Sequence, residues 1–550
     1  MHEDAVTPEF DYDWLIVGSG FGGSVSALRL SEKGYSVGVV ECGRRFADED
    51  FAASTWNLRR YLWMPKLGMR GVFRLTLFKD IFVASGSGVG GGSLGYACTL
   101  YVPPPAFFKD PQWGGLENWQ AALAPHYAEA ERMLGVVDYD RDDAAGDLLR
   151  ELGDELGAGD TYRRARVGIF LGAGGETVAD PFFGGEGPPR TGCVRCAQCM
   201  VGCRYGAKNT LVKNYLWFAE RLGATITPDR IVTDIRPLGA LDGSDGYEVT
   251  SERSGAWWRK GRRTQTARGV VVAAGALGTN KLLQSCRHAG SLPAISRRLG
   301  ELVRTNSEAI VAVTAGAGGV DFSDGVAIGA SIYPDPDTHI ETVSYGRGGD
   351  AVSGLFTMLT GDGTRLTRPL LLLAGMVRHP WQFSRTLSPF GWSQRTVTLL
   401  VMQTLDNAMA LRARPARFGR GIRLQTEQDP QRPNPTFIPV ANRAARLLAS
   451  RLGGVAQSSV PEAAGNIPTT AHILGGAVIA ADPGSGVVDH HQRVFGYENL
   501  LVCDGSAIPA NVGVNPSLTI TALAEHAMSM IPERDAHAAG ERTAAGPVSS

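Results

Sequence analysis

The feature that most constrains the fold is a glycine-rich turn near the N-terminus. A short apolar segment runs into Gly18-x-Gly20-x-x-Gly23, a helical pattern follows, and a second apolar segment, residues 36–40, ends at Glu41. This order of strand, glycine turn, helix and strand predicts a βαβ unit. In such a unit the helix N-terminus holds a pyrophosphate, and the acidic residue accepts hydrogen bonds from a ribose. The alternative is a tight strand–helix turn with no ligand.

Two further segments show the same strand and glycine-turn pattern, at residues 270–278 and 500–517. If all three turns face one ligand, the binding domain is discontinuous and a substrate domain is inserted into it. We therefore expect an α/β fold (α+β overall), with a Rossmann-type dinucleotide-binding domain and an inserted domain built on a mostly antiparallel sheet. The expected boundaries are 11–110, 191–320 (with a cysteine segment) and 461–532 for the binding domain, 111–190 for a helical cap region, 321–460 for the substrate domain and 533–550 for a disordered tail.

Composition and charge exclude several classes of protein. Hydrophobic residues make up 43% of the 550 residues and charged residues 20%, so the chain can bury large cores and is not globally disordered. Lys and Arg number 54 against 55 Asp and Glu, which leaves no overall excess of positive charge to hold nucleic acid. The acidic N-terminus does not match a secretory signal, and the apolar run Leu370–Val377 is too short to span a bilayer. We therefore expect a cytoplasmic protein.

Four of the eight cysteines are clustered as Cys193-x-x-Cys196-x-x-Cys199-x-x-x-Cys203. This is the ferredoxin-type spacing of iron–sulfur ligands, although Arg204 follows the last cysteine where ferredoxins have proline. A zinc site and a group of reduced thiols without metal remain open as alternatives. An iron–sulfur cluster would indicate that electrons pass onward to an acceptor protein or quinone.

Four long motifs occur in a specific order along the chain: GSGFGGSVSALRLSEKGYSVGVVECGRRF, GVGGGSL, TGCVRCAQCMVGCRYGAKNTLVKNYL and DGSAIPANVGVNPSLTITALAE. On these motifs the chain resembles the GMC (glucose–methanol–choline) FAD oxidoreductases, within them the cholesterol oxidase branch, and most of all its mycobacterial-type subgroup. The resemblance extends from Asp13 to about Pro532. It implies oxidation of a secondary alcohol of a bulky apolar molecule, such as a 3β-hydroxysteroid, to the ketone.

The resemblance also implies which residues hold FAD. Some relatives attach the flavin covalently through a histidine near the second glycine loop, but residues 93–100 contain no histidine, so we expect non-covalent FAD. The implied contacts are Gly18, Gly20, Gly23 and Glu41 at the ADP half, Gly90, Gly91 and Ser93 against the flavin, Ala274 and Gly275 near the adenosine, and Asp504 and Gly505 along the ribityl chain.

Three residues are implied as catalytic. In the cholesterol oxidase branch the residues that match His472 and Asn515 face the flavin and hold the substrate hydroxyl. Alcohol oxidation needs such a group, because the hydroxyl proton must be taken while hydride leaves the carbon. Glu341 matches the glutamate that moves the steroid double bond, and the alternative for it is an ordinary surface glutamate. The electron acceptor would be O2 or another acceptor.

Residues 59–82 and 370–390 mix aromatic and aliphatic residues with Arg and Lys. We interpret them as a buried helix and a wall of the substrate domain, and the alternative is an apolar lid that contacts a membrane surface. Two rival functions remain open. One is a dehydrogenase of another alcohol that passes electrons through an iron–sulfur cluster, and the other is a flavin-containing sensor or electron carrier without its own substrate.

Overall fold

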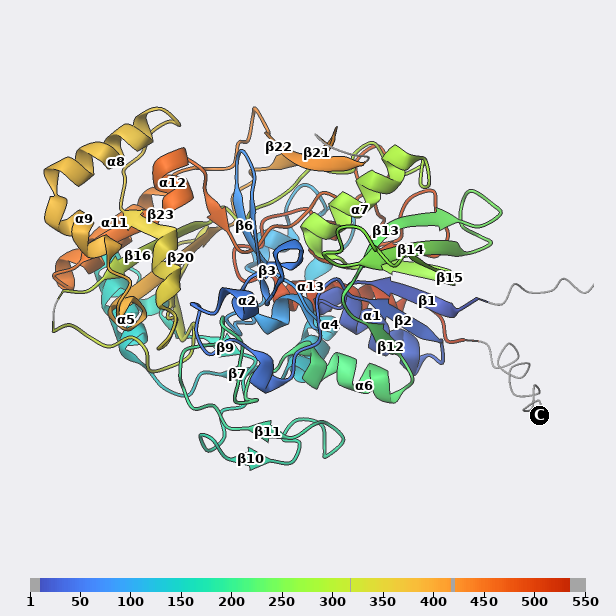
Figure 1. Ribbon diagram of the computed structural model, residues 1–550, viewed down its shortest axis with the longest axis horizontal. Helices are drawn as coiled ribbons and strands as arrows, with labels where there is room; N and C mark the ends of the chain where they lie inside the picture. The colour runs from blue at the N-terminus through green and yellow to red at the C-terminus, as the bar shows by residue number, and fades with distance from the viewer. Residues whose placement is uncertain (1–9, 317, 417–420, 535–550) are drawn as a thin grey trace, which may run out of the picture.

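The computed structural model describes residues 10–316, 318–416 and 421–534, and its two largest sheets each have seven strands (Figure 1). The first sheet has the order β12-β2-β1-β15-β14-β13, with β25 beside β15, and β13 and β14 are its antiparallel strands. Its strands are β1 (Tyr12–Val17), β2 (Val37–Val40), β12 (Thr225–Thr227), β13 (Arg230–Pro237), β14 (Tyr247–Arg253), β15 (Arg263–Val272) and β25 (Leu500–Val502).

The three glycine turns come from neighbouring parallel strands of this sheet, since β15 pairs with β1 on one side and β25 on the other. Glycine is required where the turns meet. A Cβ on Gly18, whose φ is +100°, would lie 2.3 Å from the Ala273 carbonyl oxygen, and one on Gly22 would lie 1.6 Å from that of Cys503. The expectation of a discontinuous Rossmann-type domain is therefore confirmed.

The second sheet has the order β19-β23-β16-β20-β18-β17-β8, and every pair in it is antiparallel, as expected for the inserted domain. Helices α5 (Ala144–Leu156) and α11 (Pro439–Arg451) pack on it and share a separate hydrophobic core with its strands. The sheet extends beyond residues 321–460. Its strands are β8 (Arg163–Arg164), β16 (Ala309–Thr314), β17 (Ala330–Asp335), β18 (Thr338–Val343), β19 (Phe356–Met358), β20 (Thr396–Gln403) and β23 (Val455–Ser459).

Smaller elements complete the described chain. The remaining helices are α1 (Phe21–Glu32), α2 (Leu58–Tyr61), α3 (Pro105–Phe108), α4 (Trp119–Leu134), α6 (Tyr215–Arg221), α7 (Gly275–Ala289), α8 (Thr367–Arg378), α9 (Pro380–Leu387), α10 (Trp392–Arg395), α12 (Val460–Gly465) and α13 (Ser517–Ser529). The remaining strands are β3 (Trp63–Met64), β4 (Met69–Arg70), β5 (Phe73–Leu77), β6 (Phe82–Gly86), β7 (Val137–Asp138), β9 (Arg166–Val167), β10 (Thr177–Val178), β11 (Arg190–Thr191), β21 (Met409–Pro415), β22 (Ile422–Gln428) and β24 (Thr469–Thr470).

The buried interpretation of the two mixed segments is wrong. Residues 59–82 form the end of α2, two short hairpins and exposed turns, because Gly68 and Gly71 break the apolar run. Residues 370–390 are helical in α8 and α9, but most of their large apolar side chains face solvent. Among the described helices, none has both the length and the apolar composition that crossing a bilayer requires. Most of the predicted tail, 535–550, lies outside the described residues.

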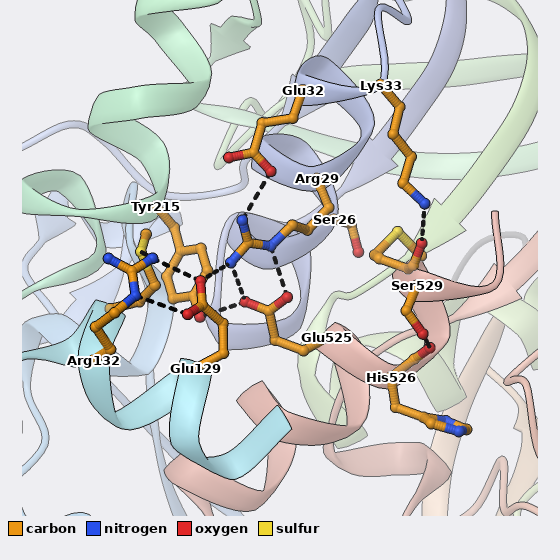
Figure 2. A network of polar contacts seen from close by, with 12 residues as sticks. Ser26, Arg29, Glu32, Lys33, Glu129, Arg132, Tyr215, Glu525, His526 and Ser529 are labelled. Atoms are coloured by element: carbon orange, nitrogen blue, oxygen red, sulfur yellow. Dashed lines mark hydrogen bonds and ion pairs between the residues drawn. The ribbon is translucent and has the colours of Figure 1, made fainter. Parts of the chain in front are cut away.

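One polar network joins α1 to three other helices, α4, α6 and α13 (Figure 2). The Arg29 guanidinium of α1 lies 2.7 Å from the Glu525 carboxylate of α13 and 2.6 Å from Glu129 of α4. The Tyr215 hydroxyl of α6 donates to Glu525 at 2.7 Å. Arg29 also pairs with Glu32 on its own helix. Because Arg29 and Glu525 are mostly buried, their charges depend on each other for solvation.

We expect Glu525→Gln to lower the free energy of unfolding by about 3 kcal/mol, because it leaves the buried Arg29 cation without its main counter-charge. Urea denaturation of the two proteins measures this difference. Glu32→Gln is the matched control, since Glu32 contacts the same guanidinium from a more exposed position, and it should cost less than about 1 kcal/mol. Equal losses for the two variants would contradict this account of the network.

Candidate active site

A cavity of about 1630 Å³ joins the two sheets. Such a volume exceeds the roughly 300–1,000 Å³ of a site for one small ligand, so it can accept a dinucleotide and a substrate together. At one end it is lined by the glycine turns of the first sheet. At the other end it is lined by mostly apolar residues of the second sheet and its connections, among them Ile310, Val343, Tyr345, Phe356 and Leu400.

The first glycine turn is open toward the cavity. A Cβ built on Gly20 would meet no atom within 4 Å, and Gly20 lies on the cavity wall at the N-cap of α1. A pyrophosphate placed there would face the free N–H groups of the helix, so the residues present fit a dinucleotide. Gly23 lies behind the wall, where it packs against the carbonyl of Gly18.

Glu41 lies at the end of β2 and borders the cavity. Its carboxylate accepts hydrogen bonds from the Ser19 N–H at 3.0 Å, the Ser19 hydroxyl at 2.8 Å and the Gly43 N–H at 2.8 Å. It also accepts a longer bond of 3.3 Å from the Gly88 N–H. Glu41 therefore connects the first glycine turn to the glycine-rich loop that contains Gly88, in addition to the predicted contact with a ribose.

The glycine-rich loop after β6, residues 86–93, packs directly on the first glycine turn. Gly91, with φ +53°, borders the cavity, and a Cβ on it would lie 2.6 Å from the Gly20 Cα. Gly90 and Ser93 are not among the residues that line the cavity. The Ser93 hydroxyl donates to the Gly90 carbonyl at 2.6 Å and accepts from the Leu211 N–H at 3.1 Å. These two residues shape the loop from behind.

The remaining predicted cofactor contacts, Ala274, Gly275, Asp504 and Gly505, all line the cavity. The Asp504 carboxylate accepts from the Gly275 N–H at 2.9 Å and from the Thr279 hydroxyl at 2.5 Å. Burial raises the pKa of this carboxyl, while its hydrogen bonds oppose the increase. Asp504 thus holds the third glycine turn, residues 500–517, against the second, residues 270–278.

His472 borders the same cavity, two residues after β24, which pairs with β6. The Glu308 carboxylate contacts its Nδ1 and also accepts from the Ala471 N–H at 2.8 Å. With Nδ1 engaged in this way, Nε2 is the ring nitrogen that can act on a ligand. Sequence reasoning missed Glu308. The available signal was an acidic residue directly before the apolar strand β16.

Asn515 precedes α13 and borders the cavity, and its amide nitrogen donates to the Glu341 carboxylate at 3.2 Å. Glu341 lies in β18 and is fully buried, so the surface alternative for it is wrong. Burial raises its pKa to about 8, with a smaller contribution from the nearby charge of Glu308 and an opposing one from the Asn515 hydrogen bond. Within the described residues, the second carboxylate oxygen of Glu341 and the amide oxygen of Asn515 have no hydrogen-bond partner.

The four clustered cysteines line a second, small cavity of about 20 Å³, together with the buried Lys208. The Lys208 ammonium donates to three backbone carbonyls, including that of Cys199. A hydrogen bond from the Cys98 thiol and the Lys208 charge lower the pKa of Cys199 to about 6. Within the described part of the chain, no group of three or more His, Cys, Asp or Glu side chains is arranged to hold a metal ion. The iron–sulfur cluster therefore stays a prediction.

Comparison with known proteins agrees with this geometry. The family described as GMC oxidoreductase matches residues 441–524. A protein named cholesterol oxidase from Mycobacterium tuberculosis is 50% identical, with 95% of this chain and 92% of that protein covered. Another of that name, from Acinetobacter baumannii, is 46% identical, with 96% and 95% covered.

Among solved structures, pyridoxine 4-oxidase from Mesorbium loti has the same fold, with a TM-score of 0.60 at 16% identity and coverage of 94% of this chain and 98% of that one. The low identity limits this likeness to the fold. The two curated relatives, by contrast, are similar over nearly their whole length. The chain belongs to the GMC oxidoreductase family, on the branch that contains these two proteins.

Proposed function

We propose that the chain is an FAD-dependent oxidoreductase that converts a secondary hydroxyl of a bulky apolar alcohol, most directly a 3β-hydroxysteroid such as cholesterol, to the ketone. One observation carries the proposal: His472 and Asn515 share a single cavity with the glycine turns that fit a dinucleotide, and the far wall of that cavity is apolar. Two relatives named cholesterol oxidase, 50% and 46% identical, support the choice of substrate.

FAD would be held non-covalently by the three glycine turns, Glu41 and Asp504, and when bound it would accept the hydride from the alcohol carbon. Each of these groups borders the cavity, and the helix N-termini of α1 and α13 both open onto it. A helix N-terminus carries partial positive charge, so it favours a pyrophosphate at α1 and negative charge on a reduced ring near α13.

His472 would take the hydroxyl proton through Nε2. The buried carboxylate of Glu308 holds Nδ1 and so keeps the ring in one orientation. An anionic partner also stabilises the imidazolium that forms when Nε2 receives the proton. Asn515 would orient the same oxygen, because its side chain borders the cavity beside the N-terminus of α13.

Glu341 would act in a second step, the movement of the steroid double bond. Its carboxyl is buried next to Asn515 and has one oxygen without a partner among the described residues. As a carboxylate it could remove a proton from the carbon beside the new ketone and return it further along the conjugated system. Its pKa of about 8 places the change of protonation in an accessible pH range.

The electron acceptor would be O2, the simplest reading of relatives named oxidase. The rival route leads through an iron–sulfur cluster at the four cysteines. Two residues that line the large cavity lie close to them: Met200 follows Cys199 in the sequence, and the Tyr96 carbonyl accepts a hydrogen bond from Lys208. A cytoplasmic location is part of the same proposal, and it is supported by the eight cysteines, which are all free of disulfide bonds.

Anaerobic purification followed by addition of cholesterol tests the function and the rivals together. We expect flavin absorption bands that bleach on addition of the sterol, no stoichiometric iron, and formation of H2O2 when air is admitted. Iron near one cluster per chain with little H2O2 would instead favour the dehydrogenase. Flavin bands that no alcohol bleaches would favour the sensor or carrier and overturn the proposed activity.

Glu308→Gln should lower kcat about 10- to 100-fold with little change in KM, because the residue holds the catalytic ring but does not contact substrate. Steady-state kinetics on cholesterol measures the two constants, and Glu308→Asp should recover part of kcat. Glu462→Gln is the matched control, since Glu462 is another buried carboxylate that pairs with Arg368 away from the cavity. A loss of kcat per folded molecule that is equal in both variants would argue against the positioning role.

The isomerisation should depend on pH through Glu341. Because burial raises the pKa of Glu341 to about 8, the active carboxylate is scarce below that pH and the isomerisation rate should rise toward about pH 9. A stopped-flow assay that starts from the 3-keto Δ5 steroid isolates this step from oxidation. In Glu341→Gln the rise with pH should disappear, together with most of the rate. Isomerisation at the parent rate in this variant would remove Glu341 as the base.

A further inference from the structure

Three hydroxyl groups interrupt the mostly apolar end of the large cavity. They belong to Tyr61 at the end of α2, Tyr345 after β18 and Thr398 in β20, and all three residues line the cavity. Thr398 is 1% exposed, and its hydroxyl has no hydrogen-bond partner among the described residues. The two phenol hydroxyls likewise have no partner within the part of the chain that the structure describes. Polar groups in such positions are normally hydrogen-bonded, so their partner has to come from whatever fills the cavity.

The antiparallel register places these hydroxyls away from the reacting end of the cavity. Glu341 of β18 pairs with Leu400 of β20, and Val343 pairs with Thr398. Alternate residues of a strand lie on the same face, so Thr398 is one step further along this face than Leu400. Tyr345 follows Val343 by two residues in the same direction. The four steps of chain from Glu341 to Tyr345 span at most about 13 Å, which is comparable to the length of the fused rings of a steroid.

The two phenols lie near each other and stay protonated. Burial raises the pKa of Tyr345 to about 12. Burial, together with the neighbouring Tyr345 phenol, raises the pKa of Tyr61 well above its usual range. Both groups are therefore neutral O–H donors near neutral pH. The Tyr61 ring packs against Phe73 with 5.2 Å between centroids, and the Tyr345 ring packs against Trp392 with 6.0 Å. This packing restricts where each hydroxyl can point.

We propose that the hydroxyls of Tyr61, Tyr345 and Thr398 form a subsite for a second oxygen atom of the substrate, at the end remote from the hydroxyl that is oxidised. The inference rests on the proposed function and narrows its substrate class to 3β-hydroxysteroids with a ketone or hydroxyl on the last ring or at the start of the side chain. A ketone oxygen accepts from O–H donors, and a substrate hydroxyl can also donate to one of them. Such a steroid should be preferred over cholesterol, which ends in hydrocarbon.

A hydrocarbon tail is the poorer occupant of this subsite. It would displace water from the three hydroxyls and return no hydrogen bond, and this loss of pairing opposes binding. A site that is built to bond a substrate oxygen therefore discriminates against an analogue that lacks it. If ordered water instead stays on the hydroxyls beside any substrate, the cavity would not distinguish the two.

Two steroids that differ in one oxygen test the subsite: dehydroepiandrosterone, which has a ketone on its last ring, and its analogue without that ketone. Anaerobic stopped-flow reduction of the flavin gives the limiting rate and the dissociation constant of each. We expect dehydroepiandrosterone to bind at least about tenfold more tightly at a similar limiting rate, because its ketone alone reaches the hydroxyls. In Tyr61→Phe/Tyr345→Phe this preference should fall to about twofold or less, while binding of the analogue changes little.

Tyr333→Phe is the matched control and should keep the full preference, because the Tyr333 phenol lies in the same sheet but does not border the cavity. Thr398→Val, a change of similar shape, should lower the preference without affecting the analogue.

Equilibrium binding separates the subsite from the oxidation. The diketone made from dehydroepiandrosterone and the matching monoketone have no hydroxyl to oxidise, so equilibrium dialysis with the purified holoenzyme measures their binding alone. A preference for the diketone, without flavin reduction by any 3β-hydroxysteroid, would keep the subsite and remove the proposed oxidation. Equal or absent binding of the two, or a preference that Tyr61→Phe/Tyr345→Phe retains, would overturn the subsite and assign the hydroxyls to water.

Discussion

The structure depends on the close contact of three glycine turns at the ends of neighbouring parallel strands. At Gly18 and Gly22 the backbone of the first turn approaches the second and third turns so closely that no Cβ could fit, and at Gly91 the loop after β6 approaches the first turn in the same way. These contacts bring together parts of the chain that are hundreds of residues apart. The Asp504 carboxylate bonds the third turn to the second, and the Glu41 carboxylate bonds the first turn to the loop after β6. These contacts shape the end of the cavity that fits a dinucleotide.

Two buried carboxylates contact the cavity-lining residues His472 and Asn515 from behind, in different environments. The Glu308 carboxylate contacts the His472 ring. Among the described residues, the Asn515 amide is the hydrogen-bond partner found for the Glu341 carboxylate, whose other oxygen has none. The apolar surroundings of Glu341 raise its pKa to about 8. One carboxylate therefore suits the support of a base, and the other suits a proton transfer of its own. Such separation by environment lets two groups of one chemical type serve two steps.

The sequence predicted the parts of the fold that depend on local pattern. The strand and glycine-turn units, the helix that begins after Pro516 and the antiparallel character of the inserted sheet were all predictable, because short-range backbone geometry restricts which residues can occupy them. Residues 370–390 show the limit of such patterns. The mixture of apolar and basic residues there was interpreted as buried, and no local signal indicated that Val377 and Trp381 would lack a covering element.

The sequence by itself predicted a dinucleotide-like ligand held by three glycine turns, and its long motifs indicated the family. Only the tertiary structure decided that Glu308 meets His472 and that Glu341 is buried beside Asn515, because these pairs are separated by more than 160 residues. Contacts of this kind follow from how the two sheets pack around the cavity, and the packing depends on long-range burial that no short stretch of sequence encodes.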